Sequence, residues 1–435
     1  MTSFDNKPDV ASPAAMVLST SRGRKQLLAA GMGNVLEYYD FVVYAFLATT
    51  IAHRFFPGES EVAGLLAAFG TFGVGFLARP LGGAIIGRIG DRKGRRTALL
   101  IAVFGMAAGT VGIGLLPTFS SIGSLAPVLL VSLRLLQGLC AGGGWGSATA
   151  FIIESAPAGR RGLYGGIGQA CITSSTLLGS AVVAIVHACF SPAEVDRWAW
   201  RVPFLLGAVL VPIGLYMRRN IEETPAFAAA QRLPRPSQDF HGSLALMGQA
   251  FGFTIIWTVS FYVMLSYMPT FTAKYAGLTS TQSLLSNAAA LAVLVAAIPF
   301  FGWLSDRIGR KPLLLSCCLG FAVLSYPLFR LILDSASLGA IVAVQIVMNL
   351  FIAAFSGAGP AALAELFPTH SRNTLMSVGY SLSTAIFGGF APFTATWLIE
   401  ITGSPISPTL YLIAAALVSG VVIVRFKETA HEILR

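Results

Sequence analysis

Long apolar runs, separated by short polar or charged segments, dominate this chain. Most runs match the roughly 20 residues that an α-helix needs to cross a bilayer, and they lack the period-two polarity of outer-membrane barrel strands. The pattern therefore predicts an all-α membrane protein with twelve transmembrane helices. The predicted spans are residues 26–51, 62–87, 97–116, 125–153, 162–188, 201–217, 243–271, 281–303, 312–332, 338–364, 373–399 and 407–425.

The distribution of basic residues predicts the orientation of these spans. Of the 29 lysine and arginine residues, 22 fall in the N-terminal tail, the loops after even-numbered spans and the C-terminal tail. Cytoplasmic loops carry the excess of basic residues in membrane proteins. Both tails, residues 1–25 and 426–435, are therefore expected in the cytoplasm, and the chain is expected to be a multi-pass protein of a bacterial inner membrane.

The chain also repeats itself across its midpoint. The loop at 218–242 divides the spans into six-helix bundles at 26–217 and 243–425, and GRIGDRKGRR at 87–96 recurs as GWLSDRIGRK at 302–311. Two parallel repeats of this kind are typical of alternating-access transporters, whose binding site lies between the halves. The sequence therefore predicts two pseudo-symmetric six-helix bundles.

Charged residues at repeated positions are candidates for conformational latches between helix ends. Glu154 and Arg161 recur as Glu365 and Arg372 after the fourth span of each half. Ion pairs at such ends can break and re-form as the halves rock, although a charge cluster that only sets topology is the simpler alternative. The latch candidates are Asp91, Arg92, Arg95, Asp306, Arg307, Arg310, Glu154, Arg161, Glu365 and Arg372.

The motif between the second and third spans resembles the signature loop of the major facilitator superfamily. Shorter stretches are similar to its metabolite–proton symporters, and one departure is Gly144, where many relatives carry Glu. The resemblance implies the major facilitator fold and the transport of citrate, α-ketoglutarate, shikimate, aromatic acids, proline or betaine together with protons. The matching stretches are GNVLEYYDFVVY at 33–44, RPLGG at 79–83, RLLQG at 134–138, WRVPF at 200–204, ETPAF at 223–227 and FGG at 387–389.

Four ionisable residues lie inside the predicted spans: Glu37, Asp40, Arg79 and Arg134. Charges at membrane depth cost about 2.5–3.5 kcal/mol each and usually mark function. Glu37 and Asp40 share one helix face and repel when both are ionised, so at least one is expected to have a raised pKa, as proton coupling needs. We therefore predict that Glu37, Asp40 and Arg134 carry proton coupling.

The two intramembrane arginines have structural alternatives. Arg134 either forms a fixed ion pair with Asp40 or Glu37, or exchanges that partner for a substrate carboxylate. Glycines that follow Arg134 in the fourth span are expected to permit close helix contact. Arg79 either extends to the cytoplasmic interface or contacts substrate.

Further polar residues in the spans are candidates for substrate contact. Each one alone is as well explained by a hydrogen bond between helices. The predicted substrate-binding residues are Arg134, Arg79, Tyr38, Tyr44, Gln137, Gln169, Tyr262, Asn287, Gln345, Asn349, Tyr380 and Ser383.

Composition excludes several classes of function. The chain is 55% hydrophobic and only 11% charged, against about 25% charged in an ordinary globular domain. Its net charge of +10 reports membrane topology and not a nucleic-acid partner. The sequence has no metal-ligand spacing and no catalytic motif, so we expect neither an enzyme nor a cofactor other than the coupled proton.

The sequence thus predicts a proton-coupled symporter of a small organic anion, with di- or tricarboxylates such as citrate favoured. Aromatic acids or shikimate are the next alternative. A zwitterionic osmolyte such as proline or betaine would use an aromatic cage of Tyr38, Tyr39, Tyr44 and Trp145. A non-transporting nutrient sensor would need a cytoplasmic signalling extension, for which the tails are short. The expected partners are the substrate, the proton and the lipid bilayer, and the expected functional unit is a monomer.

Overall fold

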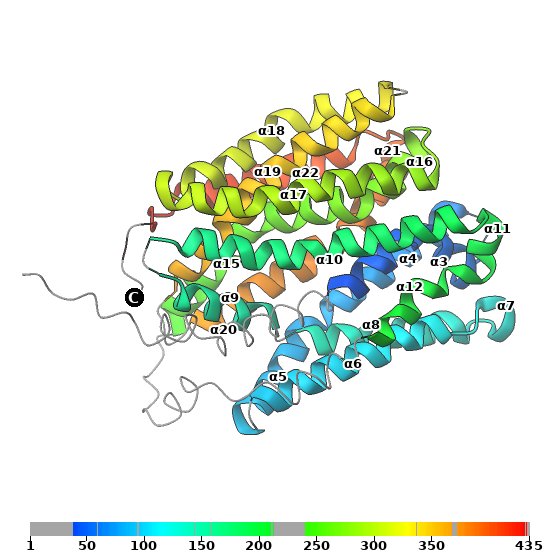
Figure 1. The fold of residues 1–435 in the computed structure, drawn as a ribbon, viewed down its shortest axis with the longest axis horizontal. Coiled ribbons are helices and arrows are strands. Elements are labelled where there is room, and N and C mark those ends of the chain that lie inside the picture. The colour runs from blue at the N-terminus through cyan, green and yellow to red at the C-terminus, as the bar shows by residue number, and fades with distance from the viewer. Residues whose placement is uncertain are drawn as a thin grey trace, which may run out of the picture.

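The computed structural model describes residues 38–209, 212, 240–430 and 432, apart from residues 59, 94, 143, 158, 336 and 368–371. Within these residues every regular element is a helix, and the long helices lie side by side in one bundle (Figure 1). The side chains of Asp91, Arg92, Arg95 and Glu154, and the whole of Glu37, lie outside what the structure describes.

Helices of the N-terminal half begin with helical residues 38–46. The following elements are α3 (Ala48–Phe55), α4 (Glu61–Leu77), α5 (Arg79–Lys93), α6 (Arg95–Leu115), α7 (Phe119–Ile122), α8 (Leu125–Ala141), α9 (Gly144–Ser155), α10 (Arg161–Cys189), α11 (Pro192–Glu194), the π-helix η1 (Val195–Ala199), α12 (Arg201–Leu206) and the 3-10 turn η2 (Gly207–Val209).

The C-terminal half contains two helices that change to π-helical geometry partway along. Its elements are α15 (Phe240–Phe261), the π-helix η3 (Tyr262–Tyr267), α16 (Met268–Tyr275), α17 (Ser280–Ile308), α18 (Lys311–Asp334), α19 (Leu338–Glu365), α20 (Arg372–Ser383), the π-helix η4 (Thr384–Gly388), α21 (Ala391–Thr402) and α22 (Pro408–Val424).

Seven helices in the described part of the chain are long and apolar enough to cross a membrane. They are Glu61–Ile86, Arg161–Cys189, Leu244–Tyr275, Ser280–Ile308, Lys311–Asp334, Leu338–Glu365 and Leu375–Thr402, and three shorter apolar helices are Leu100–Leu115, Leu125–Ala141 and Pro408–Val424. Large apolar side chains such as Leu81, Leu115 and Leu319 are exposed on the bundle surface, as contact with lipid requires. Parts of the predicted first and sixth spans lie outside the described residues, so the count of twelve stays a prediction.

We call the end of the bundle that holds the start of α10 and the turn between α17 and α18 the inner end, because predicted cytoplasmic loops lie there. The outer end holds α7, α11 and the end of α16 (Figure 1). The structure itself contains no membrane, and these two names follow the charge-based orientation.

The two halves meet along α10 and α17, which lie side by side (Figure 1). Glycines make this approach possible, because a Cβ atom added at Gly302 of α17 would collide with the backbone oxygen of Gly162 in α10. Gly166 of α10 and Gly357 of α19 lie against α17 in the same way. Small residues allow helix backbones to touch in membranes, so the backbones of α10 and α17 touch at Gly162, Gly166 and Gly302.

The π-helical turns η3 and η4 face the N-terminal helix α4 at a second contact between the halves. Gly388 lies against the ring of Tyr262, and Gly389 lies against Phe76. Such turns are rare and frequently occur at functional sites, because they shift side chains out of the regular helical register. Both interrupted helices of the C-terminal half therefore change geometry at the centre of the molecule.

The glycine seam predicts a position-specific effect on stability. A Gly302→Leu substitution should lower the free energy of unfolding by about 1–3 kcal/mol, the usual cost of overpacking. Gly248→Leu is the matched control, because a Cβ atom there meets no described atom within 4 Å. Thermal unfolding of the detergent-solubilised protein measures both, and equal midpoints for the two variants would contradict close packing at Gly302.

Candidate functional site

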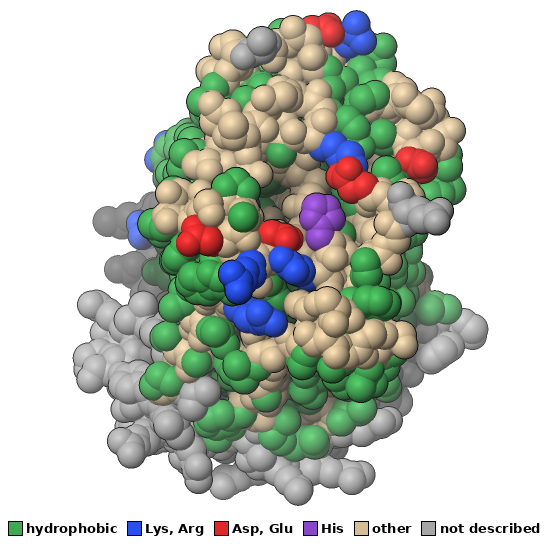
Figure 2. Space-filling model, turned by 90° about the vertical axis from the view of Figure 1, so that its right-hand side faces the viewer, with side chains coloured by type: hydrophobic (Ala, Val, Ile, Leu, Met, Phe, Trp, Pro, Cys, Tyr) green, Lys and Arg blue, Asp and Glu red, His purple; other side chains and the backbone are tan. Residues whose placement is uncertain are grey.

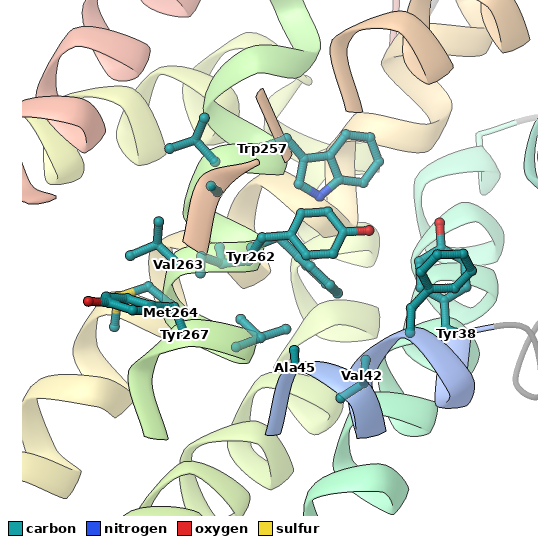
Figure 3. Packing of buried hydrophobic residues seen from close by; sticks show 14 of the residues in the cluster. Tyr38, Val42, Ala45, Trp257, Tyr262, Val263, Met264 and Tyr267 are labelled. Atoms are coloured by element: carbon teal, nitrogen blue, oxygen red, sulfur yellow. The ribbon is translucent and has the colours of Figure 1, made fainter. Parts of the chain in front are cut away.

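A small cavity lies between the halves near the middle of the bundle, with room for about one water molecule. Figure 3 shows Tyr38 on one side, facing the rings of Trp257 and Tyr262. No acidic or basic side chain is among the described residues that line it. The lining residues are Tyr38, Gln169, Trp257, Thr258, Phe261, Tyr262 and Tyr380.

Aromatic rings from both halves pack together at this cavity. Trp145 of α9 stacks on Tyr380 of α20, with ring centroids 3.7 Å apart and planes 14° apart. Trp257 of α15 lies edge-on to both, at 5.9 Å from each. The hydroxyls of Tyr38 and Tyr380 are 3.3 Å apart and form a hydrogen bond across the seam. The cavity is therefore bounded largely by ring faces and hydroxyl groups.

A chain of buried polar groups runs through the N-terminal half beside the cavity. Arg134 Nη1 donates to Gln137 Oε1 at 2.9 Å, and Gln137 Nε2 donates to Thr110 Oγ1 at 2.8 Å. The Thr110 hydroxyl in turn donates a short hydrogen bond to Asp40 Oδ2. These four side chains have at most 1% of their surface exposed. A guanidinium and a carboxylate are thus joined through an amide and a hydroxyl.

Aromatic rings surround the guanidinium of Arg134. Its Cζ lies 4.3 Å from the ring centroid of Tyr44, 4.7 Å from that of Phe41 and 5.4 Å from that of Phe72. Ring faces attract cations at these distances. Within the described part of the chain, Arg134 Nε and Nη2 have no hydrogen-bond partner. Among the described residues, the contacts of this guanidinium are therefore mainly ring faces and the Gln137 amide.

Arg79 is buried as well and lies closer to the cavity. It is 4% exposed, and its Cζ lies 4.2 Å from the Phe76 ring, 4.4 Å from the Phe41 ring and 5.6 Å from the ring of cavity-lining Tyr38. In this structure the Arg79 side chain therefore packs on rings inside the bundle and does not extend to the bundle surface. Two guanidinium groups therefore lie within 5 Å of one ring, that of Phe41.

Glycines bring α4 and α8 together around these arginines. A Cβ atom at Gly138 would collide with the backbone oxygen of Gly75, and one at Gly142 with that of Arg79. The close contact predicted for the glycines of the fourth span is confirmed. It is what allows Arg134 to reach the rings of the first and second spans.

Several predicted substrate-binding residues tie helices together instead of lining the cavity. Asn287 Nδ2 donates to the Leu265 carbonyl at 3.0 Å, Gln345 Nε2 to Ser286 Oγ at 3.3 Å, and Tyr44 Oη to the Ala68 carbonyl at 3.1 Å. Asn349 and Ser383 are also buried, and neither is among the lining residues. Of the predicted substrate residues, Tyr38, Gln169, Tyr262 and Tyr380 line the cavity.

Charged side chains link the two halves at the inner end. Asp306 accepts hydrogen bonds from the backbone N–H groups of Gly162 and Leu163 at 2.8 and 2.9 Å, at the start of α10. A carboxylate is favourable at a helix N-terminus because of the helix dipole. Arg310 contacts Asp306 at 2.8 Å and Glu365 at 3.2 Å, and Arg161 of the other half lies 3.5 Å from Glu365. We call Asp306, Arg310, Glu365 and Arg161 the inner latch.

The C-terminal segment joins the inner latch, which sequence reasoning missed. Glu428 accepts hydrogen bonds from the backbone N–H groups of Arg310 and Lys311 at 2.9 and 3.0 Å, and Thr429 Oγ1 donates to Glu365 Oε2 at 2.7 Å. Burial opposes ionisation of Glu428, but hydrogen bonds from backbone N–H groups outweigh it and lower its pKa. The acid thus caps the start of α18 and holds the latch residues in place.

Two other latch candidates lie apart from these contacts. Arg372 donates to the carbonyls of Ala364 and Phe367 at 2.8 and 3.0 Å, which caps the end of α19 within its own half. Arg307 lies over the ring of Trp303, 4.0 Å from its centroid.

The outer end also carries a link between the halves. Lys274 Nζ of α16 lies 3.2 Å from Glu61 Oε1 of α4, whereas Arg54 and Asp196 form a 2.6 Å pair within the N-terminal half. Figure 2 shows this end, where acidic and basic side chains gather at the surface. Polar contacts therefore join the halves on both sides of the cavity.

The sequence of this chain is similar to those of known membrane transporters. A family model for "Sugar (and other) transporter" matches residues 26–235, and one for "Major Facilitator Superfamily" matches residues 280–434. The chain is 35% identical over 415 residues to a citrate-proton symporter of Klebsiella pneumoniae, covering 92% of this chain and 91% of that protein. It is 32% identical over 435 residues to a proline/betaine transporter of Escherichia coli K12, covering 96% and 86%.

The chain belongs to the metabolite–proton symporters of the major facilitator superfamily. It is a multi-pass membrane transporter and not an enzyme. A solved structure of the Escherichia coli xylose transporter, in a partially occluded inward-open conformation, matches it with a TM-score of 0.80 at 18% identity, covering 95% of this chain and all of that one. The predicted all-α major facilitator fold is thereby confirmed.

The inner latch of this transporter predicts a shift between conformations. Asp306→Asn removes the negative charge at the start of α10. The closed state should therefore lose about 1 kcal/mol of stability relative to the open state, which changes the ratio of closed to open molecules roughly fivefold. Spin labels attached at Arg160→Cys and Arg307→Cys should report a larger fraction of molecules with a long distance between the labels, in which the inner end is open. The control is Asp334→Asn, whose 2.8 Å partner Arg330 lies on the same helix. An unchanged distance distribution for Asp306→Asn would count against the latch.

Proposed function

We propose that this protein is a proton-coupled symporter of a small carboxylate-bearing metabolite in a bacterial inner membrane. The observation that carries the proposal is the buried chain from Asp40 through Thr110 and Gln137 to Arg134. An ionisable acid linked to a buried guanidinium, next to a central cavity, is what exchange between a proton and a substrate carboxylate requires.

In the proposed cycle, Asp40 takes up a proton from the outer side. Its neutral form attracts the Arg134 guanidinium less strongly, so that positive charge becomes available to a substrate carboxylate. Arg79 is the nearer anchor, because it packs on cavity-lining Tyr38. One proton moving inward across 100 mV supplies about 2.3 kcal/mol, which drives accumulation. Glu37, one helical turn before Asp40, is proposed to share this role.

Alternating access is proposed to occur by rocking of the two halves about the α10–α17 seam. The contact surfaces there are glycine-rich, so few side chains must disengage when the helices slide. The inner latch holds the inner end closed, and the Lys274–Glu61 pair holds the outer end. The stacked rings of Trp145 and Tyr380 come from opposite halves, so they separate when the inner end opens.

Two substrate classes are supported by different observations. Ring faces of Tyr38, Trp257, Tyr262 and Tyr380 bound the cavity, and ring faces hold alkylated ammonium groups. With a single carboxylate anchored at Arg79, this lining favours a zwitterion such as proline or betaine. Citrate is the second candidate, supported by the similarity to the citrate-proton symporter and by the two buried guanidinium groups beside Phe41.

The coupling proposal predicts separable effects on accumulation and exchange. Asp40→Asn should abolish accumulation driven by a pH gradient and retain counterflow exchange, because Asn cannot release a proton. Proteoliposomes loaded or unloaded with substrate measure the two activities. Asp196→Asn, at the exposed outer pair, should leave both near wild type. Gradient-driven accumulation by Asp40→Asn would overturn the assignment.

The substrate proposal predicts that a tryptophan of the cavity, and not one on the bundle surface, contributes to uptake of a zwitterion. Trp257→Leu should raise the KM for uptake of labelled glycine betaine or proline about 2- to 30-fold. This is the range expected for loss of a cation–π contact of roughly 0.5–2 kcal/mol. Trp397→Leu is the control, because Trp397 is exposed on the bundle surface. If citrate is transported instead, with neither zwitterion competing, the tricarboxylate alternative holds.

A further inference from the structure

The hydroxyl group of Thr110 has one hydrogen atom and three polar neighbours. Its Oγ1 donates to Asp40 Oδ2, lies 3.0 Å from the carbonyl oxygen of Met106 one helical turn earlier, and accepts from Gln137 Nε2 at 2.8 Å. The side chain is 1% exposed. A hydroxyl can donate only one hydrogen bond but can accept two. The two acceptors therefore compete for the same proton.

The protonation state of Asp40 decides this competition. When Asp40 is ionised, the carboxylate is the stronger acceptor, so Thr110 donates to it. When Asp40 is protonated, its own O–H can donate to Thr110 Oγ1, and the threonine hydrogen turns to the Met106 carbonyl. The Gln137 amide keeps its bond in both states, because the hydroxyl oxygen has two acceptor positions. No donor or acceptor of Thr110 is lost during the exchange.

Packing around Thr110 fits a side chain of this shape. A Cβ atom at Gly207 would lie 2.6 Å from the Thr110 methyl group and 3.7 Å from Asp40 Oδ1. A Cβ atom at Gly109 would lie 2.5 Å from Gln137 Cγ. Glycines thus make room for the methyl group on one side and for the Gln137 amide on the other. The hydroxyl is held between Asp40 and Gln137.

Other ionisable groups interact electrostatically with Asp40. They include Arg134 from α8 and Tyr39 from its own helix, while Glu37 lies outside the described residues. Among these neighbours, Arg134 is reached through Gln137, and Gln137 is held by Thr110. Thr110 is therefore placed where the acid and the arginine are joined.

We propose that Thr110 is a positioning residue that sets the pH at which Asp40 is protonated, while it holds the Gln137 amide beside Arg134 in both protonation states. The inference rests on the proposed function, in which Asp40 is the proton acceptor. Removal of the hydroxyl takes a charge-assisted donor from the ionised carboxylate and leaves the neutral form less affected. Protonation then occurs at higher pH.

The test compares the pH dependence of uptake in proteoliposomes for Thr110→Val and Thr110→Ser. Thr110→Val keeps the shape and loses the hydroxyl, so the pH midpoint of gradient-driven uptake should rise by roughly one to two pH units, the equivalent of one charge-assisted hydrogen bond. Thr110→Ser keeps the hydroxyl and should titrate like the wild type. If Thr110→Val does not fold, Thr110→Ala removes the same group with less volume and should give the same shift.

The matched control is Thr173→Val, a buried threonine of α10 whose hydroxyl donates to the Gln169 carbonyl at 2.9 Å. Its pH midpoint should stay unchanged. An unshifted midpoint in Thr110→Val and Thr110→Ala, together with loss of accumulation in Asp40→Asn, would overturn the role of Thr110 alone. Retained accumulation in Asp40→Asn would overturn the proposed function instead.

Discussion

The burial of a carboxylate and a guanidinium inside an apolar helical bundle is the constraint on which the rest of this structure depends. A lone charge at membrane depth costs several kcal/mol, so each must be compensated locally. Asp40 receives a hydroxyl donor, and Arg134 receives an amide oxygen and three ring faces. Those contacts require helices at very short range, which is why glycines cluster where α4, α8 and the first helix meet.

Glycines also allow close helix contact at the seam between the halves. Backbone contact between α10 and α17 gives much packing and little side-chain interlocking. Among the described residues, the charged links between the halves lie at the two ends, where helix termini offer N–H groups and charged side chains can reach water, and the Tyr38–Tyr380 hydrogen bond lies between them at the cavity. Such a seam is stabilised by van der Waals contact when it is closed. Few hydrogen bonds must break when the two helices slide past each other. The C-terminal segment adds a further anchor, since Glu428 fixes the turn that carries Arg310.

Much of this architecture could be predicted from the apolar composition and the internal sequence repeat. The features that could not be predicted share one cause. Apolar runs predicted the all-α fold, and the repeated motif brought attention to Asp306, Arg310 and Glu365, which the structure places together. Thr110, Trp257 and Glu428 escaped notice, because a threonine or a tryptophan in an apolar helix has no signature until its helix is rotated into place. The rotation of α17 and α19 likewise decided that Asn287 and Gln345 bond to neighbouring helices.

The two halves share a sequence repeat but differ in chemistry at the centre. The acidic and basic side chains buried deep within the described spans, Asp40, Arg79 and Arg134, belong to the N-terminal half. At the cavity the C-terminal half contributes rings, hydroxyls and the π-helical turn η3. In the proposed function, proton exchange therefore falls to the N-terminal half, which holds the buried acid and both guanidinium groups. The C-terminal half is then proposed to recognise the uncharged or cationic part of a substrate, so that a productive complex would form only when both halves close on the same molecule.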